Sequence, residues 1–308
     1  MTSVIARAHR PVVRRIGKRL AAADTPEQMR AFIDRVAMLL MAPTWGVTSS
    51  NATLGGLAGL RIEPRASTSG DRGLLMFHGG GYVFGSPKMY RHLAGRIAKA
   101  AGATVYVPAY RLAPEHPHPA AIEDGLAAYR AILDRHEPGR LAVGGDSAGG
   151  NMTLAVLIAA RDEGLPMPAC IVLMSPWTDL TATSDSWTTN VDSELSIRPE
   201  TIRRATDWYC GDRDRGDPRL SPQFADLRGL PPMLIQVSDA EILSSDSTAL
   251  ADAARAADVD VRLEVAHGMW HVWQLQAPIV PEARTSIESV GEFIRRHTSA
   301  GSSSSTGE

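Results

Sequence analysis

The sequence predicts an α/β fold, a mostly parallel, doubly wound sheet with a helical cap over the carboxyl ends of its strands. Three observations predict it. Between residues 74 and 297, short apolar runs alternate with longer amphipathic segments, the pattern of parallel strands joined by crossover helices. Glycine-rich turns directly follow two of these runs, and one long polar stretch interrupts the alternation. With 44% apolar and 21% charged residues among 308, the chain can bury a large core.

Six apolar runs are expected to be strands, and five amphipathic segments are expected to be helices. The strands are expected at 74–77, 104–107, 141–143, 170–174, 233–237 and 261–265, and the helices at 89–100, 120–134, 148–162, 246–257 and 281–296. In open sheets of this kind, ligands bind beyond the carboxyl ends of the strands. Residues that directly follow a strand are therefore the candidates for a functional site.

The beginning of the chain is basic. Its first twenty residues contain six cationic side chains and no acidic one: Arg7, Arg10, Arg14, Arg15, Lys18 and Arg19. The longest early apolar run, 36–42, is too short to span a bilayer, so we expect neither a signal peptide nor an integral membrane segment. Apolar residues spaced among the arginines predict an amphipathic helix that packs on this protein, with a membrane surface as the alternative partner.

The stretch 181–217 is polar and lacks a periodic element until a helical pattern begins at 199. Long loops in compact domains are usually lids or binding loops, so we expect a cap insertion here. Residues 1–45 are expected to supply the other part of the cap. The core then comprises 46–180 and 218–298, and the Ser- and Gly-rich end, 299–308, is expected to be a disordered tail.

Charge and cysteine content exclude several classes of function. Thirty-two Lys and Arg against 34 Asp and Glu give a net charge of −2, which excludes the basic field that nucleic-acid binding requires. Cys170 and Cys210 stand alone, so neither a disulfide framework nor a zinc site is expected. This usage fits a reducing, cytoplasmic location, and we expect no metal or other cofactor.

The third apolar run is followed by Gly145-Asp146-Ser147-Ala148-Gly149, which contains the pattern Gly-x-Ser-x-Gly and leads into a predicted helix. This pattern is typical of a sharp strand-to-helix turn that holds a serine hydroxyl exposed. Because so short a pattern also arises by chance, a plain loop is the alternative.

The first run is followed by His78-Gly79-Gly80-Gly81. Consecutive glycines let backbone N–H groups face a ligand, and ester hydrolysis needs such donors where the tetrahedral oxyanion develops. We predict Gly79, Gly80 and Ala148 as the oxyanion donors, the last at a helix N-terminus. A phosphate loop is disfavoured because no Lys-Ser or Lys-Thr follows the glycines. His78 is expected to be structural.

A serine nucleophile such as Ser147 needs a base, itself oriented by a carboxylate. In this kind of fold the acid and then the histidine follow the serine along the chain, on loops after late strands. The loop after the fifth run contains Asp239 and Glu241, and the loop after the sixth contains His267 and His271. The residues alone leave both choices open.

Five stretches together carry a resemblance to a known family. They are His78-Gly79-Gly80-Gly81-Tyr82, Tyr110-Arg111-Leu112-Ala113-Pro114-Glu115, Gly145-Asp146-Ser147-Ala148-Gly149-Gly150-Asn151, Ser175-Pro176-Trp177-Thr178-Asp179 and Gly268-Met269-Trp270-His271. Over roughly 70–297 the sequence resembles the bacterial hormone-sensitive-lipase-like branch of the α/β-hydrolases, family IV of the lipolytic enzymes. The resemblance implies an α/β-hydrolase fold and a metal-independent carboxylesterase with a cap over its active site.

The resemblance also implies roles for single residues. It places the nucleophile on Ser147 and the base on His271, because the family's histidine follows Gly-Met-x, and leaves His267 as a neighbour. The family's acid is an Asp in an Asp-Pro-Leu setting, where this chain has Glu241-Ile242-Leu243. Glu241 is therefore the expected acid, and Asp239 is the alternative.

The function expected from these residues is hydrolysis of short- to medium-chain carboxylic esters through an acyl-enzyme. Hydrolysis of amides, lactones or thioesters is one alternative, because the same triad serves them. A ligand-binding homologue without turnover, like the gibberellin receptors of the superfamily, is another, which the presence of His271 disfavours. The resemblance further implies a homodimer. Four aromatic residues are candidate pocket walls, but for each one taken separately core packing is the favoured interpretation: Trp177, Trp208, Tyr209 and Trp273.

Overall fold

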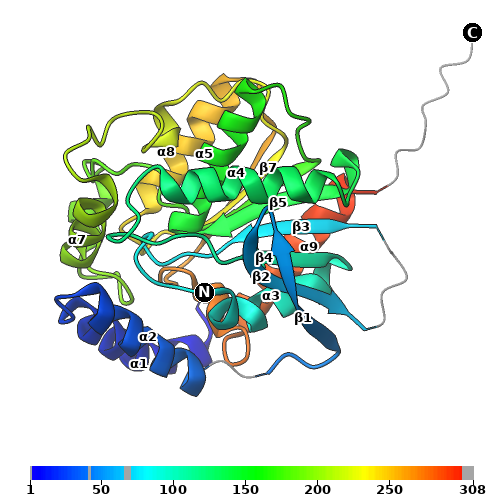
Figure 1. The fold of residues 1–308 in the computed structure, drawn as a ribbon. Coiled ribbons are helices and arrows are strands. Elements are labelled where there is room, and N and C mark those ends of the chain that lie inside the picture. The colour runs from blue at the N-terminus through cyan, green and yellow to red at the C-terminus, as the bar shows by residue number, and fades with distance from the viewer. Residues whose placement is uncertain (1, 41–42, 66–70, 300–308) are drawn as a thin grey trace, which may run out of the picture.

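The computed structural model describes residues 2–40, 43–65 and 71–299, and within these residues eight strands form a single sheet (Figure 1). The strands are β1 (Val47–Leu54), β2 (Leu57–Pro64), β3 (Gly73–Phe77), β4 (Thr104–Pro108), β5 (Leu141–Asp146), β6 (Cys170–Met174), β7 (Met233–Ser238) and β8 (Val261–Ala266). Their order in the sheet is β1-β2-β4-β3-β5-β6-β7-β8. All pairs from β4 to β8 are parallel, so the predicted parallel sheet and its six strands are confirmed. The predicted disordered tail lies, after Ser299, outside the described residues.

The antiparallel edge of the sheet was not predicted. β1 pairs with β2, and β2 pairs with β4, both in antiparallel orientation. Most β1 side chains are polar and exposed, so no apolar run marks the strand. Gly55 and Gly56 join the two strands with φ of 61° and 85°, a left-handed conformation that suits a tight hairpin turn. This glycine pair was the available sequence signal.

Helices cover both faces of the sheet (Figure 1). α4 (Ala120–Leu133), α5 (Ala148–Asp162) and α8 (Ser244–Ala256) pack on one face, and α3 (Pro87–Ala101) and α9 (Pro281–His297) pack on the other. Side chains alternate along each strand, so in β3 Leu75 and Phe77 join the first layer while Leu74 and Met76 join the second. Because both faces are buried, the central strands are apolar throughout, which explains why they could be recognised in the sequence.

Four further helices lie beyond the carboxyl ends of the strands: α1 (Val4–Ala21), α2 (Pro26–Leu40), α6 (Ser186–Thr189) and α7 (Pro199–Cys210). Figure 1 shows α1 and α2 side by side, with α7 next to them. The helix expected from 199 is confirmed as α7, whereas the short α6 was not expected. α1 is amphipathic as predicted, with Ala6, Val13, Gly17 and Leu20 buried.

These helices are fixed to the core by hydrogen bonds. Arg30 of α2 donates from Nε to the Val83 carbonyl at 2.8 Å and forms an ion pair with Glu115 at 2.6 Å. Arg204 of α7 donates to the Ala21 carbonyl at 2.7 Å, which ties α7 to the end of α1. The outer helices therefore form one connected group with the loops after the strands.

At Gly17, α1 approaches the rest of the protein very closely. A Cβ atom added there would lie 2.3 Å from the Leu195 carbonyl oxygen, a distance that real Cβ atoms essentially never show. α1 can therefore sit against the 195–196 backbone only because residue 17 has no side chain.

We predict that Gly17→Ala lowers the free energy of unfolding by about 1–3 kcal/mol, because the added methyl group forces α1 away from the Leu195 carbonyl. Alanine is the better helix former by about 1 kcal/mol, so any loss must come from this contact. Thermal and urea unfolding measure the change. The control is Gly139→Ala, where the new Cβ would meet nothing within 4 Å. Equal stability of the two variants would contradict the prediction.

Candidate active site

Ser147 lies in a strained turn between β5 and α5. Its backbone has φ 53° and ψ −121°, an uncommon conformation for a residue other than glycine. The flanking glycines are required by close contacts: a Cβ on Gly149 would lie 2.1 Å from the Phe77 carbonyl oxygen, and one on Gly145 would lie 2.4 Å from that of Gly149. The Ser147 N–H donates to the Met174 carbonyl at 3.0 Å. The turn is therefore held on both sides by the ends of neighbouring strands.

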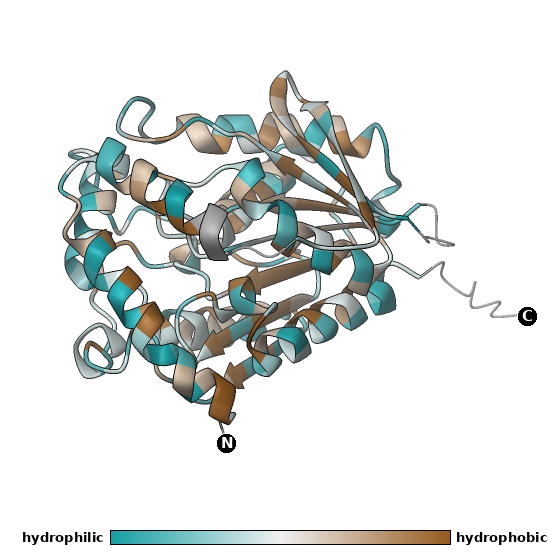
Figure 2. Cartoon of the chain, turned by 90° about the horizontal axis from the view of Figure 1, so that it is seen from below, coloured by the Kyte–Doolittle hydropathy of each residue, from teal (hydrophilic) through white to brown (hydrophobic). Residues whose placement is uncertain are grey.

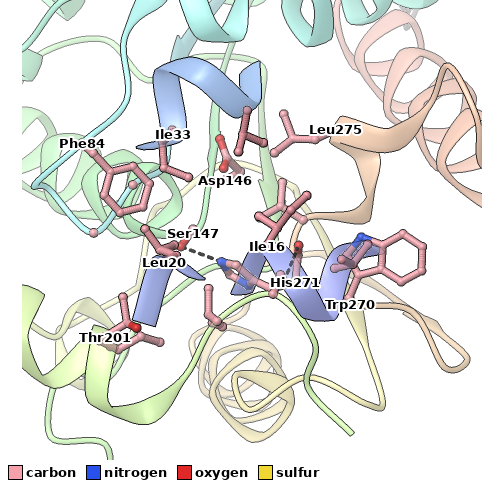
Figure 3. Close-up of a pocket in the computed structure, with 18 of the residues that line it drawn as sticks. Ile16, Leu20, Ile33, Phe84, Asp146, Ser147, Thr201, Trp270, His271 and Leu275 are labelled. Carbon is pink, nitrogen blue, oxygen red and sulfur yellow. Dashed lines mark hydrogen bonds between the residues drawn. The ribbon is translucent and has the colours of Figure 1, made fainter. Parts of the chain in front are cut away.

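A continuous hydrogen-bonded chain runs from Ser147 to a buried carboxylate. His271 Nε2 is 2.8 Å from Ser147 Oγ (Figure 3), and His271 Nδ1 is 2.9 Å from Glu241 Oε2. The other oxygen of Glu241 accepts hydrogen bonds from Ser175 Oγ at 2.9 Å and from the Ser238 N–H at 2.8 Å. Glu241 is fully buried, and the His271 side chain is 8% exposed. The carboxylate is thus held in one orientation and fixes the imidazole.

The other two candidates form a separate pair. His267 Nδ1 lies 2.5 Å from Asp239 Oδ2, and the second Asp239 oxygen accepts the Gly268 N–H at 2.7 Å. The His267 side chain is 76% exposed and that of Asp239 is 42% exposed. The structure brings Glu241 and His271 to Ser147 and leaves Asp239 and His267 at the surface, where they bind the loop between β8 and His271.

The charge around His271 raises its pKa. Burial by itself would lower that pKa, but the hydrogen bond and the charge of Glu241 oppose burial, and so do the charges of Glu194 and Asp146. The balance raises the pKa of His271 above its ordinary value of 6.5. The protonated imidazolium is therefore stabilised in this site.

Glu194 is a residue that the sequence analysis missed. It is fully buried, and its Oε1 accepts the Ser196 N–H at 2.8 Å, while its Oε2 has no partner among the described residues. Burial, assisted by the charge of Glu241, raises the pKa of Glu194. Glu194 lies in a polar stretch with many Ser, Thr and Asp residues, and nothing in the sequence distinguishes it from its exposed neighbours.

The prediction that Gly79 is an oxyanion donor is wrong in this structure. Its N–H donates to Asp146 Oδ1 at 3.0 Å and to Tyr90 Oη at 3.1 Å, so it does not face the cavity. Gly80 and Gly81 do line the cavity, and their N–H groups have no hydrogen-bond partner among the described residues. Their φ values of 119° and 61° suit glycine.

The N–H groups of Ala148 and Gly81 are two further candidate oxyanion donors. Ala148 was predicted from the sequence, whereas Gly81 was not. Ala148, the first residue of α5, has an N–H that the helix itself leaves unpaired. Gly81 was missed because three consecutive glycines look alike in a sequence. The signal that could have separated them is Asp146: a buried acid beside the serine needs a donor, and Gly79 is the glycine nearest the end of the adjacent β3.

His78 supports the glycine loop, as expected. It is buried, and burial lowers its pKa to about 4, so its imidazole is neutral at neutral pH. His78 Nδ1 is 2.8 Å from the Gly79 carbonyl oxygen, and the ring stacks on Tyr110 with centroids 4.3 Å apart. Tyr110 Oη donates to the His78 carbonyl at 2.6 Å.

A mainly apolar cavity of about 170 Å³ opens above Ser147 and His271 (Figure 3). Its walls come largely from the outer helices. They include Val13, Ile16 and Leu20 of α1, Ile33 of α2 and Ile202 of α7, together with Phe84, Trp270 and Leu275 from loops and η3 (Trp273–Gln276). A substrate in this cavity would contact mainly apolar side chains, both aliphatic and aromatic.

Of the four aromatic residues considered as candidate walls, Trp177 alone lines this cavity. Tyr209 is fully buried and stacks on Tyr82 with centroids 3.7 Å apart, which joins α7 to the glycine loop. Trp273 is buried in the core layer of α3 and α9, and Trp208 packs at the edge of the opposite layer. For these three, core packing prevails over a role at the site.

The described residues contain no group of three or more His, Cys, Asp or Glu side chains that could hold a metal ion. Cys170 and Cys210 are both buried and unpaired. None of the helices in the described part of the chain combines the length and apolar character needed to cross a membrane.

Comparison with known proteins gives consistent matches. A family model described as the alpha/beta hydrolase fold matches residues 74–275. An acetyl-hydrolase of Streptomyces hygroscopicus is 43% identical over 238 residues, which cover 77% of this chain and 80% of the relative. An esterase of Acinetobacter venetianus is 35% identical over 271 residues, which cover 87% of this chain and 88% of the relative. The crystal structure of an esterase from the bacterial hormone-sensitive lipase family superposes with a TM-score of 0.91 at 38% identity, covering 97% of this chain and 100% of that one.

We predict that the His271 imidazole titrates above its ordinary pKa of 6.5 in the intact protein and at a lower pH in Glu241→Gln, where the hydrogen bond and the charge of the Glu241 carboxylate no longer oppose burial. Proton NMR of the histidine ring signals over pH measures both values, with His271→Asn used to assign the resonance. Asp239→Asn serves as the control and should leave the His271 titration unchanged. A His271 pKa that does not change in Glu241→Gln would contradict the conclusion that the Glu241 carboxylate raises it.

Proposed function

The chain belongs to the α/β-hydrolase family, in its bacterial hormone-sensitive-lipase-like branch, and on this premise we propose that Ser147, Glu241 and His271 form its catalytic triad. The reaction is the hydrolysis of carboxylic esters, which the names acetyl-hydrolase and esterase also state for its relatives. The observation that carries the proposal is the hydrogen-bonded chain from Ser147 Oγ through His271 to Glu241, with distances of 2.8 and 2.9 Å.

In the proposed mechanism, His271 Nε2 takes the proton of Ser147 Oγ as this oxygen attacks the ester carbonyl carbon. The imidazolium that forms is stabilised by Glu241 and returns the proton to the departing alkoxide, which leaves as an alcohol. The acyl group is then bonded to Ser147. A water molecule, deprotonated by His271, attacks this acyl-enzyme and releases the carboxylic acid and the free serine.

We assign the stabilisation of the tetrahedral oxyanion to the N–H groups of Gly80, Gly81 and Ala148. The first two have no hydrogen-bond partner among the described residues, and the third is at the N-terminus of α5, whose dipole favours negative charge. Preorganised donors of this kind act on charge that develops only in the transition state.

The proposed substrates are esters of short- to medium-chain acids. A cavity of about 170 Å³ with mainly apolar walls supports this size class. The same triad could act on amides, lactones or thioesters, but no described contact favours them over esters. The intact hydrogen bond between Ser147 and His271 speaks against a ligand-binding homologue without turnover.

We propose that residues 1–45 and 181–217 form the cap and that 46–180 and 218–298 form the catalytic core. This division is supported by the origin of the side chains, since the triad comes from loops of the sheet whereas α1, α2 and α7 supply cavity walls. A cytoplasmic location is supported by the two unpaired cysteines. The homodimer stays a prediction.

Ser147→Ala should reduce kcat/KM for p-nitrophenyl butyrate by roughly a thousandfold or more, because the attacking oxygen is removed. Its melting temperature should stay close to that of the parent, since the turn is held by the glycines and not by the hydroxyl. Steady-state kinetics and thermal unfolding are measured on the same preparation. Substantial turnover by pure, folded Ser147→Ala would remove this residue from its role.

Glu241→Gln should lower kcat by a few orders of magnitude, because a neutral amide cannot stabilise the imidazolium and favours the wrong tautomer. Asp239→Asn is the matched control and should cost much less, since Asp239 contacts His267 and Gly268 but not His271. Turnover numbers in the reverse order, with both variants folded, would transfer the acid role to Asp239.

Activity on p-nitrophenyl esters of graded acyl length should peak at short to medium chains and fall for long ones. Ile16→Trp should lower the octanoate-to-acetate ratio of kcat/KM by about tenfold, because the larger ring fills part of the cavity. Val12→Trp, on the exposed side of the same helix, is the control. An unchanged ratio in Ile16→Trp would place the acyl chain elsewhere.

A further inference from the structure

The outer face of α1 carries a cluster of positive charge that has no counterpart. Its exposed cations are Arg7, Arg14, Arg15, Lys18 and Arg19. None of them forms an ion pair within the described part of the chain. The sixth basic residue, Arg10, is partly buried and donates to the Gly268 carbonyl at 2.8 Å. Since the whole chain has a net charge of −2, the remainder of the protein is acidic, and α1 is a local basic surface on it.

Acidic groups near this surface are already engaged elsewhere. Asp24, in the turn after α1, lies 3.4 Å from Arg204 of α7. Glu282, at the start of α9, accepts both the N–H and the hydroxyl of Ser3 at the beginning of α1. These carboxylates anchor the two ends of the helix and leave the cations between them unneutralised.

Apolar side chains are interleaved with these cations. Val4 is 71% exposed, Ile5 is 48% exposed and Val12 is 43% exposed. Ile5 and Val12 are two helical turns apart and lie on the same side of α1. Figure 2 shows the helix that begins at the N-terminus, with an apolar first turn followed by alternating polar and apolar segments. Exposed aliphatic residues beside Arg and Lys are typical of helices that lie in a membrane interface.

The inner face of the same helix is part of the cavity. Val13 and Leu20 are buried, and both line the cavity together with Ile16. Figure 3 shows Ile16 and Leu20 pointing toward the space above Ser147. A surface that contacts the outside of α1 would therefore be separated from the cavity by the thickness of one helix, about 10 Å.

We propose that the outer face of α1 docks this protein on the surface of an anionic lipid bilayer, with its cavity held at the interface where apolar esters partition. The cations supply attraction to anionic headgroups, and Val4, Ile5 and Val12 enter the boundary between headgroups and acyl chains. A nucleic acid or an acidic protein would satisfy the charges, but neither explains three exposed aliphatic side chains among them. Docking is independent of the proposed function, whereas the supply of ester substrate from the lipid rests on it.

Sedimentation with vesicles tests the docking without any need for turnover. The full chain is mixed with vesicles of phosphatidylcholine alone or with about one-third phosphatidylglycerol. We expect binding to the anionic vesicles only, weakened at high salt. The variant Arg7→Gln/Arg15→Gln/Lys18→Gln should bind at least tenfold more weakly. The matched control, Arg219→Gln/Arg228→Gln/Arg255→Gln, removes the same charge from other elements and should bind like the parent.

One further variant and two activity measurements sharpen the result. Val4→Ser/Val12→Ser should also weaken binding to the anionic vesicles while leaving all cations in place. On soluble p-nitrophenyl butyrate the triple α1 variant should match the parent, since none of its three residues lines the cavity. On a long-chain ester dissolved in the anionic vesicles, the parent should gain rate over neutral vesicles and the variant should not.

Equal binding to neutral and anionic vesicles would overturn the proposal, and so would full binding by the triple α1 variant. Retention on heparin without vesicle binding would overturn it in favour of a different polyanion. Failure of the proposed esterase activity would show as lost turnover on the soluble ester with vesicle binding intact, so the two failures are distinguishable.

Discussion

The site depends on one backbone constraint, the strained turn at Ser147. A non-glycine residue with φ 53° costs free energy and persists only where surrounding contacts determine it. Here the contacts are the near-touching backbones of Gly145, Gly149 and Phe77, which bring β3, β5 and the start of α5 together. The same contacts set the distance between the serine hydroxyl and the glycine loop. A looser turn would separate the proposed nucleophile from the N–H groups of Gly80 and Gly81.

Backbone strain recurs at two further positions around the proposed triad. Ser175 has φ 46° and Val272 has φ 51°, and the two are joined because Ser175 Oγ accepts the Val272 N–H at 3.2 Å and donates to Glu241. The acid and the loop that carries His271 are thus linked through one hydroxyl group. Strained residues that cluster in this way are typical of preorganised sites, in which the fold compensates for unfavourable local geometry.

The elements that could be predicted from the sequence are those with a periodic apolar pattern or with a locally unusual composition. Central strands were recognisable because burial on both faces makes them apolar, and Ser147 was recognisable because the glycines beside it serve close backbone contacts. β1 escaped prediction because an exposed edge strand needs no apolar run. The choice among Gly79, Gly80 and Gly81 depends on which N–H is bound by Asp146, a contact between two strands that no local pattern encodes. Glu194 escaped because its burial arises from how the 181–217 segment folds over the sheet.

In the proposed function, chemistry and selectivity come from different parts of this chain. Loops at the ends of β5, β7 and β8 position the proposed triad, and these loops are fixed by the sheet. The cavity walls come from α1, α2 and α7, which are held by a few contacts such as Arg30 with Glu115 and Gly17 against the Leu195 carbonyl. Aliphatic side chains on these helices can change in size without moving Ser147, so the range of esters can vary while the acyl transfer step is retained. Because the same α1 also faces solvent with its cations, the helix that lines the cavity on its inner side is also the one that would contact the proposed lipid surface.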